Sequence, residues 1–402
     1  MKAIDRFMSW TIPLADLNYD HEEDAAVLDV LHSKWLTMGA VTEQLEREFA
    51  AHHRASHAIA VSNATQGLHL ALLALGIGPG DEVIVPSLSF VATANCVLYT
   101  GAGVRFADIC SLLEPTIDPA SVEAAITPRT KAVICMHYGG YPCRMPELAE
   151  LCARYKLCLV EDAAHAPGAW LHARALGAWG EIGCFSFFSN KNLATGEGGM
   201  LLTADAGLAA RLRLLRSHGM TSLTWERHQG HASAYDVVAL GYNDRLDELR
   251  AALGRVQLKK LPAANARRLA LTLAYHRLLQ DSPIEVPFRA RLADCPPAAI
   301  EGKPNDRARS ATGYLPACHL LPMLLPDEAA RPAFVAALKA AGIQTSLHYP
   351  PIHRFSYYRA LYPGVTLQLS EAYAARQVTL PLYPTMGDEM VAQVCAAVEQ
   401  AL

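Results

Sequence analysis

Short apolar runs alternate with amphipathic stretches through the first two hundred residues of the chain. The runs have the length and the β-branched content of strands. They lie at 57–61, 82–85, 104–106, 132–135 and 157–160. Between them, apolar positions recur at helical spacing, as Leu148, Leu151 and Tyr155 do. Strand and helix alternating in this way predict a mostly parallel central sheet with helices on both faces.

Helical periodicity also marks the rest of the chain. Predicted helices are 25–31, 42–53, 68–75, 146–155, 208–215, 244–261, 332–341 and a last one through Met390, Val394 and Val398. Acidic residues at 20–24 precede the first helix, where its dipole favours negative charge. Thr385 and Asp388 have the spacing of a capping box ahead of the last helix. Residues 344–348 have a strand pattern, whereas 283–320 hold many prolines and show little periodicity.

The chain is long enough for two domains, since it has 402 residues. The helix predicted at 244–261 is long enough to leave the sheet. We therefore expect a large α/β domain at 1–262, whose first 18 residues form an arm packed on the body. A smaller α+β domain is expected at 263–402.

Composition narrows the class of protein. Apolar residues make up 51% and charged residues 18%, as in a soluble globular enzyme. A formal charge of −4 without a basic stripe argues against binding nucleic acid. No window has the length and hydropathy of a membrane span, and the first residues lack an apolar signal core. The cytoplasm is the expected location.

The chain has ten cysteines, and none of them forms a Cys-x-x-Cys pair. Several lie inside apolar runs, as Cys135 and Cys158 do. Buried free thiols in a reducing compartment account for this pattern better than a disulfide framework or a zinc site.

One polar turn stands out at residues 183–202. The segment 185–188 reads as a short strand that carries Ser186, and the turn that follows carries Lys191. Gly196, Gly198 and Gly199 come next, before a strand pattern resumes at 200–202. So many glycines let the backbone approach something bulky or adopt positive φ, which suggests that the lysine is held in place. A loop lysine alone is as often a solvated surface charge.

Asp162 follows the apolar run at 157–160, and its position favours a held lysine over a solvated one. A strand-end Asp followed by a strand-end Ser and a Lys supplies the partners of pyridoxal 5′-phosphate. The amine forms the Schiff base, the carboxylate keeps the pyridine nitrogen protonated, and the hydroxyl meets the phosphate. Thr65 lies in a turn before a helix, where free backbone N–H groups suit an anion. Such a turn is also an ordinary helix cap, so alone it is a weak signal.

At this point the sequence resembles a known family. It is similar to the fold-type I, pyridoxal-phosphate-dependent sugar aminotransferases of the DegT/DnrJ type over nearly its whole length. The motifs that carry the resemblance are Trp-Leu-Thr-Met-Gly at 35–39, Ser-Asn-Ala-Thr at 62–65, and the segments 86–93, 161–165, 185–199, 241–245 and 348–353. Residues 211–219 and 235–237 are similar to members that aminate C4 of nucleotide-linked 4-keto sugars.

The resemblance implies a role for each cofactor-site residue. Lys191 is the Schiff-base lysine and proton carrier, and Asp162 is the partner of the pyridine nitrogen. Phe90 stacks on the cofactor ring, where a core phenylalanine is otherwise the simpler interpretation. His165 lies beside the ring or its phenolic oxygen. The phosphate is held by Ala64, Thr65 and Ser186, and by Asn243 from the neighbouring subunit, so a homodimer with shared active sites is implied.

The substrate side is implied more loosely, by Gly39, His137, Arg245, His348 and His353. Arg245 is a candidate for substrate phosphates, with a structural ion pair as the alternative. His348 and His353 invite a metal interpretation, but no third ligand is evident, so no metal is expected.

Two positions depart from the family pattern. Many relatives have Gly-Thr where this chain has Ala64 and Thr65. Asp244 replaces the aromatic residue common between Asn and Arg, which places a carboxylate next to the phosphate-binding positions Asn243 and Arg245.

The resulting hypothesis is amino transfer in two stages. Glutamate gives its amino group to the cofactor, and a keto sugar then receives it, at C4 of a nucleotide-linked 4-keto-6-deoxyhexose in amino-sugar biosynthesis. One alternative is transfer to another keto sugar or a keto-cyclitol of the scyllo-inosose type, with glutamine as donor. Another is a cofactor-binding regulatory protein that has lost turnover.

Two other enzyme classes are disfavoured. Deoxysugar dehydratases on the same fold replace the lysine that this chain keeps. Cysteine desulfuration needs a catalytic cysteine on a mobile loop, and none is identifiable.

Overall fold

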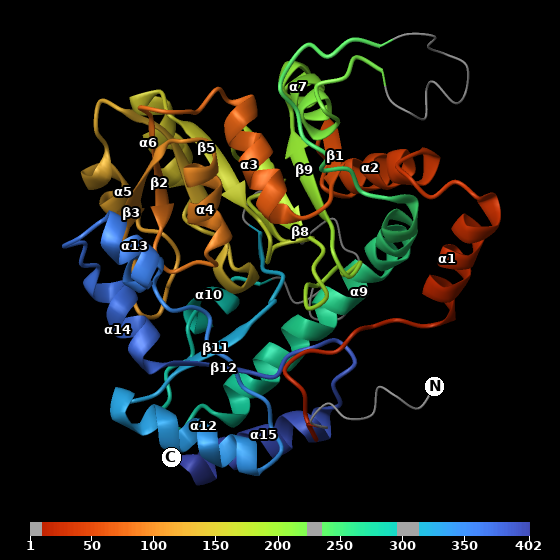
Figure 1. Ribbon diagram of the computed structural model, residues 1–402. Coiled ribbons are helices and arrows are strands. Elements are labelled where there is room, and N and C mark those ends of the chain that lie inside the picture. The colour runs from red at the N-terminus through yellow and green to blue at the C-terminus, as the bar shows by residue number, and fades with distance from the viewer. Residues whose placement is uncertain (1–9, 223–234, 296–312) are drawn as a thin grey trace.

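The computed structural model describes residues 10–222, 235–295 and 313–402 (Figure 1). Its centre is a seven-stranded sheet with the order β1-β9-β8-β5-β4-β2-β3. The strands are β1 (His57–Val61), β2 (Glu82–Pro86), β3 (Gly103–Ala107), β4 (Thr130–Met136), β5 (Cys158–Asp162), β8 (Ile182–Ser186) and β9 (Gly199–Thr203). Only β9 runs antiparallel to its neighbours, so the predicted mostly parallel sheet is confirmed.

Alternate residues of each strand face two separate apolar cores. In β4, Val133 and Cys135 belong to one core, and Ala132 and Ile134 belong to the other. Helices α3 (Ala64–Ala74), α4 (Ala92–Tyr99) and α7 (Ala206–Arg216) cover one face. Helices α2 (Ala40–His52), α5 (Pro119–Ala125), α6 (Met145–Tyr155) and the long α9 (Glu248–Leu278) contribute to the other. Both faces of the sheet are therefore dry, which explains its near-continuous apolar runs.

The C-terminal part is built around a small antiparallel pair, β11 (Leu321–Leu324) and β12 (Gln377–Leu380). Its helices are α10 (Arg289–Leu292), α12 (Arg331–Ala340), α13 (Ser356–Leu361), α14 (Gln368–Arg376) and α15 (Asp388–Ala401). A further small sheet has the order β10-β6-β7, in which β6 (Trp170–Leu171) pairs with β10 (Tyr314–Leu315) on one side and with β7 (Arg174–Ala175) on the other. In Figure 1, α9 runs from beside the sheet toward α12 and α15.

The predicted domain boundary after residue 262 falls inside α9. Pro262 lies within this helix of 31 residues, which continues to Leu278. The prediction started the helix four residues early and ended it at 261. One apolar core also joins residues of the sheet to residues of the C-terminal part. The two-domain division stays a prediction.

The N-terminal segment and first helix follow their local chemistry. Ile12 is buried and bridges Ile343, so the described part of the arm packs on the C-terminal part as expected. Helix α1 (His21–Ser33) begins with a capping box between Asp20 and Glu23. The first observation agrees with the predicted arm, and the second agrees with the acidic residues predicted to begin the first helix.

Three local predictions were wrong. Helix α15 has Gly387 as its N-cap and no side-chain cap, because Thr385 bonds Asp16 and Asp388 pairs with Arg267. Residues 344–348 make only one isolated bridge, from Ser346 to Thr379. Strand β8 ends at Ser186 instead of 188, since the chain turns there toward the lysine.

Candidate active site

Lys191 follows β8 at the carboxyl-end edge of the sheet. Its backbone N–H donates to the carbonyl of Phe188 at 2.8 Å, which fixes the turn. Among the described residues its amine has no hydrogen-bond or ion-pair partner. Desolvation lowers the pKa of this amine to about 8, partly opposed by the carboxylate of Asp162. The turn thus holds a shielded amine that loses its proton far more readily than an ordinary lysine.

Asp162 is the last residue of β5 and is 4% exposed. Its Oδ2 accepts a hydrogen bond from Thr93 Oγ1 at 2.7 Å, and its Oδ1 accepts one from the backbone N–H of Ala164 at 3.2 Å. Burial raises the pKa of this carboxyl, whereas those two donors and the charge of Lys191 lower it. Lys191 and Asp162 are therefore electrostatic neighbours in one buried site, as the sequence predicted.

The predicted phosphate-binding residues meet beside these two. Ala64 begins α3, with Asn63 as its N-cap, and Thr65 is in the first turn of that helix. Ser186 ends β8 and pairs with Gly199 across to β9. A Cβ on Gly199 would lie 2.9 Å from the backbone nitrogen of Ala64, so only glycine lets the strand approach the helix N-terminus this closely. Helix and strand together bring free N–H groups and hydroxyls to one point.

Imidazole rings from distant segments surround the lysine. His165 Nδ1 accepts from the backbone N–H of Gly139 at 3.3 Å, so Nε2 carries the proton, 3.0 Å from the Tyr349 hydroxyl. Burial, and then the charges of Lys191 and His348, hold the pKa of His165 well below its usual range. His319 packs 4.4 Å from His165, ring centre to ring centre. His165 is thus a neutral imidazole of fixed tautomer close to Lys191. Its place beside the cofactor ring stays a prediction.

Phe90 is 54% exposed, which removes the interpretation that it is a core phenylalanine. Its ring centre lies 6.0 Å from that of Tyr349. Phe90 precedes Thr93 by three residues, and the hydroxyl of Thr93 donates to Asp162. The structure therefore leaves an aromatic face open close to the carboxylate.

His137 and His353 do not join this group. His137 is fully buried, with Nε2 3.0 Å from Glu161 Oε2 and Nδ1 accepting from the backbone N–H of Cys143. His353 is buried between Ser87 Oγ at 2.7 Å and Glu371 Oε1 at 2.9 Å. Because both nitrogens of each ring bond protein groups, neither placement favours the predicted substrate contact.

His348 lies closer to the lysine. Its Nδ1 is 2.9 Å from the Thr379 hydroxyl, and its backbone N–H donates to Gln377. Desolvation, and then the charge of Lys191, lower the pKa of His348 to about 4. It is a neutral side chain at the edge of the site. Within the described parts of the chain, no group of three His, Cys, Asp or Glu side chains could hold a metal ion.

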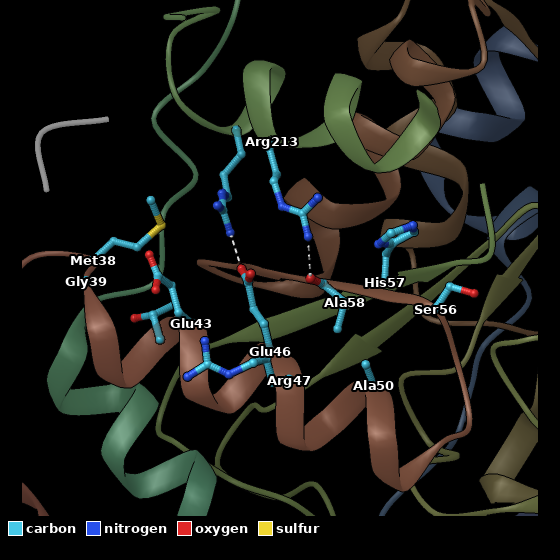
Figure 2. Close-up of a pocket in the computed structure, with 12 residues that line it drawn as sticks. Met38, Gly39, Glu43, Glu46, Arg47, Ala50, Ser56, His57, Ala58 and Arg213 are labelled. Atoms are coloured by element: carbon cyan, nitrogen blue, oxygen red, sulfur yellow. Dashed lines mark hydrogen bonds and ion pairs between the residues drawn. The ribbon is translucent and has the colours of Figure 1, made fainter. Parts of the chain in front are cut away.

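Gly39 lies elsewhere, at the start of α2. Its N–H donates to Glu248, which also accepts from Val41 and Thr42 and so caps that helix. Gly39 lines a hollow of about 440 Å³ between α2 and α7. Figure 2 shows Arg213 reaching from α7 toward Ala58, whose carbonyl oxygen lies 3.5 Å from its guanidinium, with Glu43 and Glu46 on the α2 side of the hollow.

This hollow lies along β1, an edge strand of the sheet. Glu46 accepts from the backbone N–H of Ala60, and Arg216 donates to the Ala60 carbonyl and to Glu46. The two side chains therefore satisfy the free edge of β1, which has no strand partner there. Lys191 and Asp162 do not line it.

Asn243 and Arg245 lie on either side of the unusual Asp244. The side chain of Asn243 is exposed, next to a bridge with Ser217, as a contact to another subunit would require. Desolvation and the charge of Arg216 lower the pKa of Arg245, whose guanidinium has no partner among the described residues. The ion-pair alternative for Arg245 therefore has no support. Asp244 is buried with Oδ2 unpaired, and its carbonyl accepts from Ser62 beside the phosphate turn.

The sequence missed four residues of this neighbourhood. They are Thr93, Asn192, His319 and Tyr349. Asn192 follows Lys191 and bonds Asn265 and His319, so it joins the lysine turn to α9. Thr93 and Tyr349 lie inside motifs already noticed, but nothing in their spacing indicates contacts with Asp162 or His165. His319 had no sequence signal, because it reaches the site only through the tertiary fold.

These residues fit pyridoxal phosphate. The shielded amine has no partner in the described part of the chain, and the carboxylate has lone pairs that no described donor uses. The open phenyl face and the helix N-terminus lie nearby. In the described ranges, no helix has the length and hydropathy needed to span a membrane.

Comparison with known proteins agrees with this geometry. The sequence matches the profile of the DegT/DnrJ/EryC1/StrS aminotransferase family over residues 18–399. It is 39% identical to the spore coat polysaccharide biosynthesis protein SpsC of Bacillus subtilis (strain 168), over 98% of this chain and 97% of SpsC.

Two solved structures share the architecture. DesV of S. venezuelae, in complex with a ketimine intermediate, superposes with a TM-score of 0.82 at 36% identity over 94% of each chain. The PLP form of Spr1654 from Streptococcus pneumoniae gives a TM-score of 0.85 at 25% identity, over 97% of this chain and 98% of that one. The predicted fold-type I architecture is thereby confirmed.

Proposed function

Because this chain belongs to the DegT/DnrJ/EryC1/StrS aminotransferase family, it is an aminotransferase, and we propose that it aminates a nucleotide-linked keto sugar. The donor in this proposal is glutamate. The acceptor is C4 of a 4-keto-6-deoxyhexose, as in amino-sugar biosynthesis. The observation that carries the proposal is that the shielded amine of Lys191, in the turn after β8, and the carboxylate of Asp162, at the end of β5, influence each other's pKa.

The family implies pyridoxal phosphate as cofactor. When bound, this group supplies an aldehyde for amines and a cationic ring that accepts electrons released at the amino acid Cα. Ala64, Thr65 and Ser186 are the proposed phosphate ligands. Phe90 would cover one face of the ring, and Asp162 would accept from its nitrogen.

Lys191 has two tasks in this scheme. Its amine would hold the cofactor covalently while no donor is bound, and once free it would act as the base that takes up and returns the proton of the donor Cα. Both tasks require the unprotonated amine. A pKa lowered to about 8 by desolvation makes that form accessible near neutral pH, which suits a general base.

The substrate assignment rests on charge and on relatives. Arg245 has a guanidinium without a partner in the described chain, as binding a substrate phosphate requires. The name of SpsC refers to polysaccharide biosynthesis, a setting that consumes modified sugars. We further propose that a second copy brings Asn243 to the phosphate of this site, so the active unit is a homodimer.

A half-reaction screen tests the proposal. Protein carrying the aminated cofactor is mixed with nucleotide-linked 4-keto and 3-keto sugars, and with scyllo-inosose, while the return of the aldehyde absorbance is followed. We expect the fastest return with the 4-keto-6-deoxyhexose. A response to scyllo-inosose alone would replace the substrate assignment with the keto-cyclitol alternative.

The amino donor, and the alternative that the protein is a regulator without turnover, are tested with the other half-reaction, from the aldehyde form to the aminated form of the cofactor. Glutamate should bleach the aldehyde absorbance faster than glutamine does. Protein that binds pyridoxal phosphate but responds to neither donor would instead be a cofactor-binding regulator. Sedimentation with and without Asn243→Ala, together with cofactor affinity, separates loss of the dimer from loss of a shared phosphate ligand.

A further inference from the structure

The carboxylate of Asp162 is supported by a buried pair of hydroxyls. Thr93 Oγ1 donates to Asp162 Oδ2 at 2.7 Å, and Ser89 Oγ lies 2.6 Å from Thr93 Oγ1. Thr93 is 0% exposed, and Ser89 is buried as well. Their hydrogen bonds are therefore not shared with bulk water.

The donor and acceptor in each of these two hydrogen bonds follow from the number of protons available. A threonine hydroxyl has one proton, and the carboxylate can only accept. Because Thr93 gives its proton to Asp162, Ser89 must donate to Thr93. The order Ser89 to Thr93 to Asp162 polarises each hydroxyl toward the charge, which strengthens both bonds in a buried site.

These hydrogen bonds also fix the orientation of the Asp162 carboxylate. Thr93 is in the first turn of α4, and its backbone N–H donates to the carbonyl of Phe90. The same turn therefore carries the open aromatic face and the hydroxyl that orients the carboxylate. Asp162 Oδ1 is held from the other side by the N–H of Ala164. Two donors fix the plane of the carboxylate and leave lone pairs free for a third.

A purely structural role does not require hydroxyls at these positions. The surroundings of Thr93 on α4 are apolar, with Ala94, Cys96 and Val97 all buried. Valine has the shape of threonine and would fill the same space without burying a hydroxyl. We therefore attribute the buried hydroxyls of Ser89 and Thr93 to the carboxylate of Asp162, which they support.

We propose that Thr93, supported by Ser89, is a positioning residue that keeps Asp162 ionised and aimed at the ring nitrogen of the cofactor. This inference rests on the proposed function, in which Asp162 is the partner of that nitrogen. Without the Thr93 hydroxyl, Asp162 is a weaker acceptor for the ring N–H. The cofactor ring then holds its proton less firmly and withdraws electrons less strongly.

The experiment compares holoenzymes of four variants with the wild type. Thr93→Val removes the hydroxyl at constant shape, Thr93→Ser restores it, and Ser89→Ala removes only its support. Thr100→Val is the matched control, because Thr100 is a buried threonine at the C-terminal cap of the same helix, where its hydroxyl donates to the carbonyl of Val97. The first readout is the pH dependence of the visible absorbance of the bound cofactor.

We expect the midpoint of this titration to rise in Thr93→Val by about one to two pH units, the size of one lost hydrogen bond to a charge. The reason is that a less cationic ring leaves the nitrogen joined to Lys191 more basic. Ser89→Ala should shift it in the same direction by less, and Thr93→Ser and Thr100→Val should resemble the wild type. The rate of the glutamate half-reaction should fall about tenfold in Thr93→Val, with the KM for glutamate nearly unchanged.

Other outcomes overturn the proposal. A wild-type midpoint and rate in Thr93→Val would exclude it, as would a Thr93→Ser variant as impaired as Thr93→Val, since that indicates packing. If Thr93→Val does not fold, an unshifted midpoint in Ser89→Ala excludes it equally.

Failure of the proposed function looks different. In that case the wild type would bind pyridoxal phosphate and show the titration, but neither glutamate nor a keto sugar would change its absorbance, and the shift in Thr93→Val could still be measured. If borohydride reduction left no pyridoxyl label on Lys191, the assignment of the cofactor site itself would be wrong.

Discussion

Two neighbouring carboxylates on β5 face opposite sides of the sheet and differ in almost every physical respect. Glu161 accepts four hydrogen bonds, from His137 Nε2 and from the backbone N–H groups of Gly177, Trp179 and Gly180. Among the residues that the structure describes, Asp162 accepts only two, from Thr93 and Ala164. Both residues are buried, so the difference is not one of exposure.

The comparison teaches how a functional charge can be told from a structural one. A buried carboxylate with all its lone pairs used has nothing left to offer a ligand, and it fixes the backbone that surrounds it. A buried carboxylate with lone pairs unused, next to an amine of lowered pKa, retains interaction energy for something that binds. The face of Glu161 is complete without a ligand, and the face of Asp162 is not.

The largest expected effect is on the Asp162 face, at Lys191. Replacing Lys191 by Ala should lower the rate of amino transfer by about a thousandfold or more, because in the proposed function this amine is both the covalent anchor and the proton carrier. Half-reaction kinetics with glutamate measure this. Lys131→Ala, on the exposed side of β4, is the matched control and should keep full activity. Turnover by Lys191→Ala at the wild-type rate would end the assignment of the site.

Asp162→Asn should separate function from stability. We expect activity to fall about a hundredfold or more, since a neutral amide cannot hold the proton of the ring nitrogen. The free energy of unfolding of the apo-protein should stay equal or rise, because a buried charge with only two donors is removed. On the same sample, urea unfolding measures the free energy of unfolding and half-reaction rates measure the activity. A large loss of stability would make Asp162 a second structural carboxylate.

Glu161→Gln should show the reverse. Each oxygen of Glu161 accepts two donors, so the NH2 group of glutamine would face two buried N–H groups. The expected loss is about 2–4 kcal/mol in the free energy of unfolding, with activity per folded molecule within about twofold. Urea unfolding measures the loss, and Glu150→Gln on the exposed side of α6 is the control. Equal stability of the two variants would contradict the comparison.

Sequence reasoning identified Asp162 but not what distinguishes it from Glu161. The strand, its end and the lysine turn follow from local patterns, because apolar runs and glycine clusters reflect nearby backbone needs. The four donors of Glu161 come from segments that only the folded chain brings together. The same limit explains His137 and His353, whose nitrogens are occupied by groups distant in sequence. It also explains Thr93, whose neighbour Asp162 lies 69 positions away.

The smallest effect concerns the pH at which the Asp162 face accepts its cofactor. Binding to apo-protein needs the unprotonated amine of Lys191, whose pKa desolvation lowers from 10.5 to about 8. The association rate of pyridoxal phosphate should therefore rise about tenfold between pH 7 and 9 and then level off. An ordinary lysine would give about a hundredfold rise with no plateau in that range. Stopped-flow absorbance distinguishes the two curves.

The sign of the linkage gives an internal control. Because the folded pKa of Lys191 lies below its unfolded value, the apo-protein should gain stability as pH rises from about 8 toward 10.5. The Asp162 carboxylate raises the pKa of Lys191, so Asp162→Asn should move the association midpoint below that of the wild type, whereas Glu161→Gln should leave it in place. A midpoint that moves equally in both variants would mean that the lysine senses both faces of β5, and that the sheet does not separate a structural charge from a functional one.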